Sequence, residues 1–250
     1  MNLAIDIGNT AVKWATFDEG SQRPVASGQW VTPGSTQSST ASKRRSTSPS
    51  LGENLNGMDY DRVLVCASGE VPVELAALPR LSAAMELPIR IGYKSPATLG
   101  PDRLAAACGA WALHRGENCL VIDAGTCITV DFLSADGMYH GGAIMPGLEM
   151  NLKALHTFTA KLPLISLEGV TKAPVLGRTT EESILSGTLG ATMMALAGFV
   201  ALYRQKSPAL CVLLTGGASG PLTAAGATGW EVQPQLTLIG LNEIMRKNEK

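Results

Sequence analysis

The fold is decided by a stretch near the start of the chain, Ile5-Asp6-Ile7-Gly8-Asn9-Thr10-Ala11-Val12-Lys13. Apolar residues alternate with other residues on both sides of the Gly8-Asn9 pair. A period of two is typical of β-strands, and Gly-Asn pairs are typical of tight turns between strands. The stretch therefore predicts a β-hairpin whose first strand carries a carboxylate, Asp6, just before the turn.

The same design occurs again around Asp123-Ala124-Gly125-Thr126. In both copies, the turn glycine stands two residues after an Asp that follows an Ile. It also precedes a second turn glycine by twelve residues in both copies, at Gly20 and at Gly137. An internal repeat of this kind implies two structurally related halves.

Helix signals follow each hairpin. Pro101 stands at the first position of a predicted helix, and a long apolar helix and a buried-type strand at 210–214 follow the second hairpin. Strands and helices thus alternate in each half, which predicts an α/β fold with mixed sheets and flanking helices. We place the N-terminal half at 1–115 and the C-terminal half at 116–250.

One segment interrupts this pattern, the Ser/Thr-rich stretch 33–50 with its basic cluster Lys43-Arg44-Arg45. It has no apolar periodicity, so we expect a flexible surface loop. The functional alternative is a contact with an acidic partner or a phosphorylation site.

Composition limits the classes of partner. With 250 residues and 45% hydrophobic content the chain can bury a substantial core, and its formal net charge is only -1. The net charge does not attract the chain to nucleic acid or to an anionic membrane, so an anionic ligand must be bound by a local group of residues. The five cysteines form no Cys-x-x-Cys pair and are interpreted as buried thiols. No secretory signal is recognisable, and we expect a cytoplasmic protein.

The segment Ser183–Tyr203 contains no charged residue and is long enough to be considered as a membrane span. It is also rich in Gly, Ala, Ser and Thr, interleaved with larger apolar residues. This mixture favours a tightly packed internal or interface helix in a soluble protein.

The residues at the two turns suit phosphate binding. Phosphates need backbone N–H groups in a concavity, a cation and a carboxylate that holds Mg²⁺. Gly8 allows close backbone approach, Asn9 and Thr10 add donors, and Lys13 lies on the outgoing strand. A single Gly-Asn turn is common in hairpins without any ligand, but two copies with a carboxylate each favour a phosphate site. The sequence has no Walker loop and no Gly-rich loop of the protein-kinase type.

Paired phosphate-binding hairpins resemble the actin-like ATPase superfamily, which has ribonuclease H-like halves with an ATP cleft between them. Within it, the sequence is similar to the type III pantothenate kinase family. The motifs that carry the resemblance, in the family's order, are Asp6–Lys13, Gly100–Arg103, Asp123–Asp131, Gly141–Gly147 and Thr215–Gly217. Cys127, where the family usually has Ala, and Pro101, at a variable position, are departures that we expect to leave activity intact.

The resemblance implies how ATP and its ions are bound. The residues of the first turn that would bind ATP and Mg²⁺ are Asp6, Gly8, Asn9, Thr10 and Lys13. Asp6 would be the Mg²⁺ partner. At the second turn, Asp123 would hold a monovalent cation, K⁺ or NH₄⁺, and Thr126 would contact the nucleotide. The turn at Gly216-Gly217 would face the adenosine.

The resemblance also implies a pantothenate site, often at a homodimer interface. Its residues would be Tyr93, Gly100, Pro101, Asp102, Arg103 and Thr180. Asp102 would be the catalytic base, which orients the substrate hydroxyl and accepts its proton late, because a loose phosphoryl-transfer transition state needs little early deprotonation. Arg103 could bind the substrate carboxylate in a fork.

We therefore expect ATP-dependent phosphorylation of pantothenate to 4'-phosphopantothenate, the first step of coenzyme A synthesis. Two alternatives share the same ATP-binding parts. One is a kinase for another small hydroxylated substrate, such as a sugar or a carboxylate. The other is an accessory nucleotide-binding protein linked to transcriptional control, against which the intact Lys13 and Asp102-Arg103 argue.

Overall fold

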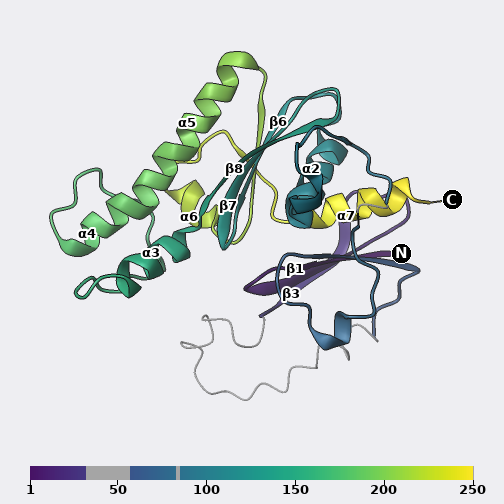
Figure 1. Ribbon diagram of the computed structural model, residues 1–250, viewed down its shortest axis with the longest axis horizontal. Coiled ribbons are helices and arrows are strands. Elements are labelled where there is room, and N and C mark those ends of the chain that lie inside the picture. Colours follow the sequence, from purple (N-terminus) through teal and green to yellow (C-terminus); the bar gives the residue numbers. More distant parts are fainter. Residues whose placement is uncertain (32–56, 83–84, 250) are drawn as a thin grey trace. The chain divides into compact units, whose positions relative to one another are not determined.

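The computed structural model describes residues 1–31, 57–82 and 85–249 (Figure 1). The chain divides into a first unit, Met1–Arg115 with Gln235–Lys250, and a second unit, Gly116–Pro234. The sequence places 235–250 in the second half, whereas these residues pack within the first unit. The predicted loop 33–50 lies outside the described residues.

The first unit is built on a four-stranded sheet. Its strands are β1 (Asn2–Ile7), β2 (Ala11–Phe17), β3 (Pro24–Val31) and β4 (Arg62–Ala67). Their order is β3-β2-β1-β4, with β1 antiparallel to β2 and parallel to β4. The alternating residues Leu3, Ile5 and Ile7 are fully buried and pack with Val12 and Val65. The predicted hairpin is confirmed.

Two helices complete the first unit, α2 (Pro101–Leu113) and α7 (Leu236–Lys247). The shorter elements between β4 and α2 are η2 (Val73–Leu75), β5 (Arg90–Ile91) and η3 (Pro96–Thr98). A Cβ atom added at Gly240 of α7 would overlap the carbonyl oxygen of Ala105, and one added at Gly109 of α2 would overlap that of Leu236. The two helix backbones therefore pack in direct contact. This packing explains why the last helix belongs with the N-terminal segment.

A buried polar contact joins α7 to the sheet of the same unit. The Asn2 side-chain amide donates to Oδ1 of Asn242 at 2.8 Å, and both residues are buried. Glu243, only 8% exposed, accepts hydrogen bonds from Arg115 and Arg246 at 3.0 and 3.1 Å. A buried carboxylate is tolerated when it is paired in this way.

The second unit repeats the strand pattern of the first. Its strands are β6 (Cys119–Ala124), β7 (Cys127–Leu133), β8 (Met138–Pro146), β9 (Cys211–Thr215) and β10 (Glu231–Val232). Within this unit β6 is antiparallel to β7, β7 is antiparallel to β8, and β9 is parallel to β6. Each unit thus has an antiparallel meander of three strands with a parallel strand beside its first member. The repeat predicted from the two Asp-Gly turns extends to the sheet topology.

The second unit also contains helical segments, several of which pack on this sheet. They are α3 (Leu148–Thr157), α4 (Thr180–Leu185), a π-helical segment η4 (Ser186–Gly190), α5 (Ala191–Lys206) and α6 (Ser219–Ala224). Leu189, Leu196 and Val200 are buried in the same core cluster as Ile122 and Val130 of the sheet. Figure 1 shows α4 and α5 in green as one nearly continuous rod.

This continuous helix, Thr180–Lys206, is the one stretch of the described chain that is long and apolar enough to cross a membrane, judged by length and composition alone. Core helices of soluble proteins pass the same test. Of the most apolar 18-residue window of this helix, 39% is buried. The side chains of Met194 and Leu202 are each 60% exposed. The helix is therefore only partly internal, and its predicted role at an interface stays a prediction.

The contact between α2 and α7 leads to a stability prediction. Gly240→Ala adds a Cβ where the Ala105 carbonyl lies, so the helices must separate, and the free energy of unfolding should fall by about 1–3 kcal/mol. Urea unfolding followed by circular dichroism measures the change.

Gly220→Ala in α6 is the matched control, because its added Cβ meets nothing within 4 Å. Removing an exposed helical glycine should leave the protein as stable or more stable. Equal losses in the two variants would contradict the packing argument.

Candidate functional site

The first Asp-Gly turn joins β1 to β2. The N–H of Gly8 donates to the carbonyl oxygen of Ala11 at 3.0 Å and closes the turn. The strand register pairs Asp6 with Lys13. Because directly paired residues of antiparallel strands point to the same face, the carboxylate and the ammonium group lie on one side of the sheet. The structure thus brings together the predicted anion-binding and cation-binding parts of this turn.

The second turn is also closed by its glycine N–H, but it is one residue shorter. The N–H of Gly125 donates to the carbonyl oxygen of Cys127 at 3.0 Å, and Thr126 is exposed at the tip. Asp123 pairs in register with Thr129 of β7 and with Thr215 of β9. The second carboxylate therefore lies at the end of a central strand, between two threonines.

Gly216 approaches this second turn very closely. Its φ of 91° lies in the left-handed region, and an added Cβ would stand 2.5 Å from both Oδ1 of Asp123 and the carbonyl oxygen of Ala124. Only glycine combines this φ with this space. The predicted Gly216-Gly217 turn is therefore adjacent to the Asp123 carboxylate within the second unit.

The predicted substrate motif begins α2 in the first unit. Gly100 is the N-cap residue and Pro101 the first helical residue, as the sequence predicts. Oδ1 of Asp102 accepts a hydrogen bond from the N–H of Arg103 at 2.9 Å. The Arg103 side chain is nearly buried, and its guanidinium carbon lies 5.7 Å from the centre of the Tyr93 ring. Tyr93 and the Gly100–Arg103 motif are thus brought together.

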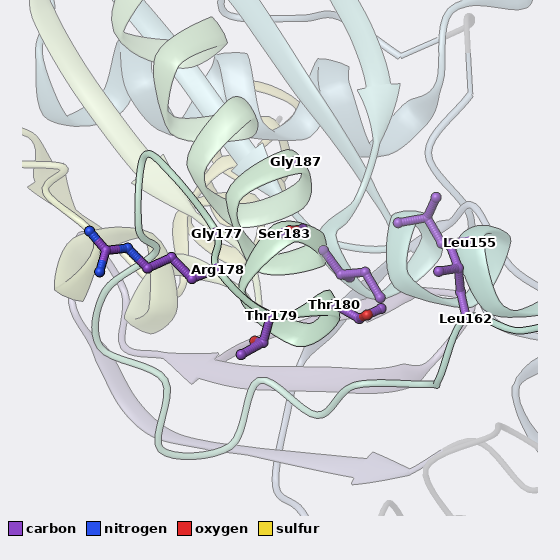
Figure 2. A pocket seen from close by; sticks show the side chains of 9 residues that line it. Leu155, Leu162, Gly177, Arg178, Thr179, Thr180, Ser183 and Gly187 are labelled. Atoms are coloured by element: carbon purple, nitrogen blue, oxygen red, sulfur yellow. The ribbon is translucent and has the colours of Figure 1, made fainter.

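Thr180 lies in the second unit, at the wall of a pocket of about 670 Å³ (Figure 2). The pocket's lining residues are Leu155, Leu162, Gly177, Arg178, Thr179, Thr180, Ser183, Ile184 and Gly187. In Figure 2 the Arg178 side chain extends away from the side where Leu155 and Leu162 lie. The lining therefore combines the hydroxyl groups of Thr179, Thr180 and Ser183 with Arg178 and with apolar side chains.

A capping arrangement fixes Thr180 in place. The hydroxyl oxygen of Thr179 accepts from the N–H of Glu182 at 3.1 Å, and the Glu182 carboxylate accepts from the N–H of Arg178 at 2.7 Å. Sequence reasoning missed this pocket apart from Thr180. The Thr-x-x-Glu signature of a helix start was the available signal.

The cysteines differ from the expectation of buried thiols. Cys66, Cys108 and Cys119 are buried, and burial raises the pKa of the Cys108 thiol. Cys127 is exposed instead, because it follows the tip of the second turn. A thiol group is thus accessible beside the predicted nucleotide-binding turn.

Comparison with known proteins identifies the family. A family model described as type III pantothenate kinase matches residues 2–202. The chain belongs to the type III pantothenate kinase family. A type III pantothenate kinase of Phocaeicola vulgatus is 37% identical over 254 residues, which cover all of both chains. Another, of Cytophaga hutchinsonii, is 34% identical over 256 residues and covers 99% of this chain and 100% of its own.

Solved structures show the fold. A protein of Campylobacter jejuni described as a Baf family transcriptional activator has a TM-score of 0.57 at 18% identity and covers 98% of each chain. The activator of 2-hydroxyisocaproyl-CoA dehydratase from Clostridium difficile, with bound ADPNP, has a TM-score of 0.53 at 17% identity. The match covers 98% of this chain and 95% of the activator chain. These likenesses establish the actin-like ATPase fold and, at such identities, nothing about activity.

Membership of the type III pantothenate kinase family gives the reaction. The protein is a kinase that phosphorylates pantothenate, at the start of coenzyme A synthesis. A kinase reaction of this kind uses ATP and a divalent metal ion.

The start of α2 provides a test of the substrate motif. A Cβ added at Gly100 would stand 2.5 Å from Oδ1 of Asp102. In Gly100→Ala the carboxylate must rotate away from the Arg103 N–H, so kcat should fall by about 10- to 100-fold through misplacement of the Asp102 side chain. Steady-state kinetics with saturating ATP measure the effect.

Ala97→Ser serves as the control, since Ala97 is exposed in the preceding η3 segment. Its kcat should match that of the unmodified protein. A Gly100→Ala protein with normal kcat would show that the orientation of Asp102 does not matter.

Proposed function

We propose that the chain transfers the γ-phosphoryl group of ATP to the primary hydroxyl of pantothenate with the residues of its two Asp-Gly turns and of the Gly100–Arg103 motif. The observation that carries this assignment is the agreement between motif and geometry. Asp6 stands opposite Lys13, and Asp102 and Arg103 share one helix start beside Tyr93. The proposed roles of the individual residues rest on this agreement.

The first turn would bind the phosphates of ATP. Gly8, Asn9 and Thr10 present the turn backbone, and Lys13 neutralises phosphate oxygens. The donor set fits Mg²⁺, because Asp6 offers carboxylate oxygens, the ligands that this hard cation prefers. Bound Mg²⁺ would neutralise charge that develops on the transferred phosphoryl group.

The second turn would complete nucleotide binding. Thr126 is exposed at the tip, where its hydroxyl can contact the nucleotide, and the Gly216-Gly217 backbone would face the adenosine. Asp123 would hold a monovalent cation, K⁺ or NH₄⁺. In support, Asp123 pairs in the strand register with Thr129 and Thr215, whose hydroxyl groups are oxygen donors on the two neighbouring strands.

The Gly100–Arg103 motif would bind pantothenate. Arg103 can pair with the substrate carboxylate through its planar guanidinium group, while Tyr93 stacks on that group and restricts its orientation. Gly100 and Pro101 form the helix start that positions Asp102. Thr180 would be a further residue that contacts pantothenate.

Asp102 would act as the catalytic base. Its free carboxylate oxygen would accept a hydrogen bond from the substrate hydroxyl and orient it toward the γ-phosphorus. As the new O–P bond forms and the bond to the ADP oxygen breaks, the hydroxyl proton passes to Asp102. A loose transition state allows this transfer to be late, so an ordinary carboxylate suffices.

We also propose a cytoplasmic homodimer that binds neither nucleic acid nor membrane. The near-zero net charge supports the absence of a polyanionic partner. The exposed apolar residues Met194 and Leu202 of α5 support burial against a second copy. Analytical ultracentrifugation at micromolar concentration gives the mass of the assembly.

The proposed reaction predicts substrate-dependent ADP formation. With ATP and Mg²⁺, pantothenate should release ADP in K⁺ or NH₄⁺ and much less in Na⁺, because Na⁺ is smaller than the proposed cation. A coupled assay measures ADP, with a panel of sugars and hydroxy acids as alternative acceptors. Turnover of another acceptor, or nucleotide binding without any turnover, would identify one of the two alternative functions.

The proposed role of Asp102 leads to a further prediction. Asp102→Asn keeps the size of the side chain but cannot accept the hydroxyl proton, so kcat should fall by about 100- to 10,000-fold while ATP binding is retained. Isothermal titration with a non-hydrolysable ATP analogue separates binding from turnover. Asp18→Asn, at an exposed turn after β2, is the control and should behave normally. A near-normal rate for Asp102→Asn would remove Asp102 from this role.

A further inference from the structure

The segment that follows β4 is bonded to the first Asp-Gly turn. β4 runs parallel to β1, and the last residue pair of the two strands is Ile7 with Ala67. Beyond this pair, the N–H groups of Ser68 and Gly69 both donate to the carbonyl oxygen of Ile7, at 3.0 and 3.1 Å. The residue that precedes the turn glycine is therefore held by a separate part of the chain.

Gly69 then packs directly against the backbone of the turn. A Cβ atom at Gly69 would stand 2.6 Å from the carbonyl oxygen of Gly8, 2.8 Å from its carbonyl carbon and 3.0 Å from the nitrogen of Asn9. All three atoms belong to one peptide group, so no side-chain rotation could relieve the overlap. Gly69 is not one of the glycines with positive φ. Glycine is therefore needed here for space and not for backbone conformation.

The second unit shows the same requirement at its own turn. A Cβ added at Gly147 would overlap the carbonyl oxygens of Gly125 and Thr126. The N–H of Ala218, after β9, donates to the carbonyl oxygen of Ala124 at 2.9 Å, as Gly69 donates to Ile7. In both units, a glycine outside the turn packs against the peptide group that follows the turn glycine. Gly69 does so in the first unit and Gly147 in the second. Two independent occurrences argue for a shared constraint on the turns.

We infer that Gly69 is a positioning residue for nucleotide binding, which holds the Gly8–Asn9 peptide in the conformation that receives the phosphates. The inference rests on the proposed role of the first turn. Gly69 itself need not touch the nucleotide. It acts because it packs against the Gly8–Asn9 peptide, so the turn backbone is already ordered when ATP arrives.

The test is Gly69→Ala. The added Cβ must displace the Gly8–Asn9 peptide, and a shift approaching 1 Å should lower kcat/KM for ATP by about 10- to 100-fold. The KM for ATP and the Kd of a non-hydrolysable ATP analogue with Mg²⁺ should rise. The KM for pantothenate should stay within about twofold, because the substrate motif lies on a different element. A general loss of structure would not produce this separation.

The matched control is Gly220→Ala, whose added Cβ meets nothing within 4 Å. It should retain the kinetic constants of the unmodified protein. A Gly69→Ala protein that melts normally and binds the ATP analogue normally overturns the inference. If the unmodified protein itself fails to bind the analogue, the proposed function fails instead.

Hydrogen exchange on the unmodified protein covers the case in which Gly69→Ala does not fold. Addition of the ATP analogue with Mg²⁺ should slow exchange in a peptide spanning 62–72 together with one spanning 2–12. The amides of Ser68 and Gly69 are bonded to the strand that carries the turn, so nucleotide bound at the turn should suppress the local opening that exposes these amides. Protection confined to 2–12 would also overturn the inference.

Discussion

Parallel pairing beside each hairpin is the interaction on which the rest of the structure depends. β4 pairs with β1, and β9 pairs with β6, so each Asp-bearing strand has a parallel neighbour. Parallel strands end at the same edge of a sheet, and the residues after β4 and β9 therefore meet the turns. Without this pairing, each turn would be a hairpin tip exposed on all sides, with no preformed shape for a phosphate.

Local pattern was sufficient to predict the parts that depend on neighbouring residues. Alternating apolar residues and a Gly-Asn pair define a hairpin within about a dozen positions, and its register then places Asp6 opposite Lys13. Pro101 similarly marks the start of α2, because its ring favours the first helical position. The resemblance to the family implied roles for these residues. The geometry of the first unit is compatible with the substrate-binding roles implied for Tyr93 and Gly100–Arg103.

Contacts between distant segments could not be predicted in the same way. Nothing near Gly69 in the sequence indicates that it packs against Gly8, and the Gly109–Gly240 approach that places α7 beside α2 is equally invisible. A glycine can mark a turn, a bulge or a close contact, and only the tertiary structure distinguishes among these. The exposure of Cys127 was missed because the five cysteines were interpreted together, although Cys127 directly follows the Gly125-Thr126 turn.

The packing of α7 within the first unit also affects the order in which the two units can fold during translation. The first unit needs residues 235–247, yet the whole second unit, Gly116–Pro234, lies between them and α2 in the chain. As the chain emerges from the ribosome, the second unit can fold while α2 still lacks its partner and exposes the surface around Gly109. The core of the first unit can therefore be completed only after the whole second unit has been synthesised.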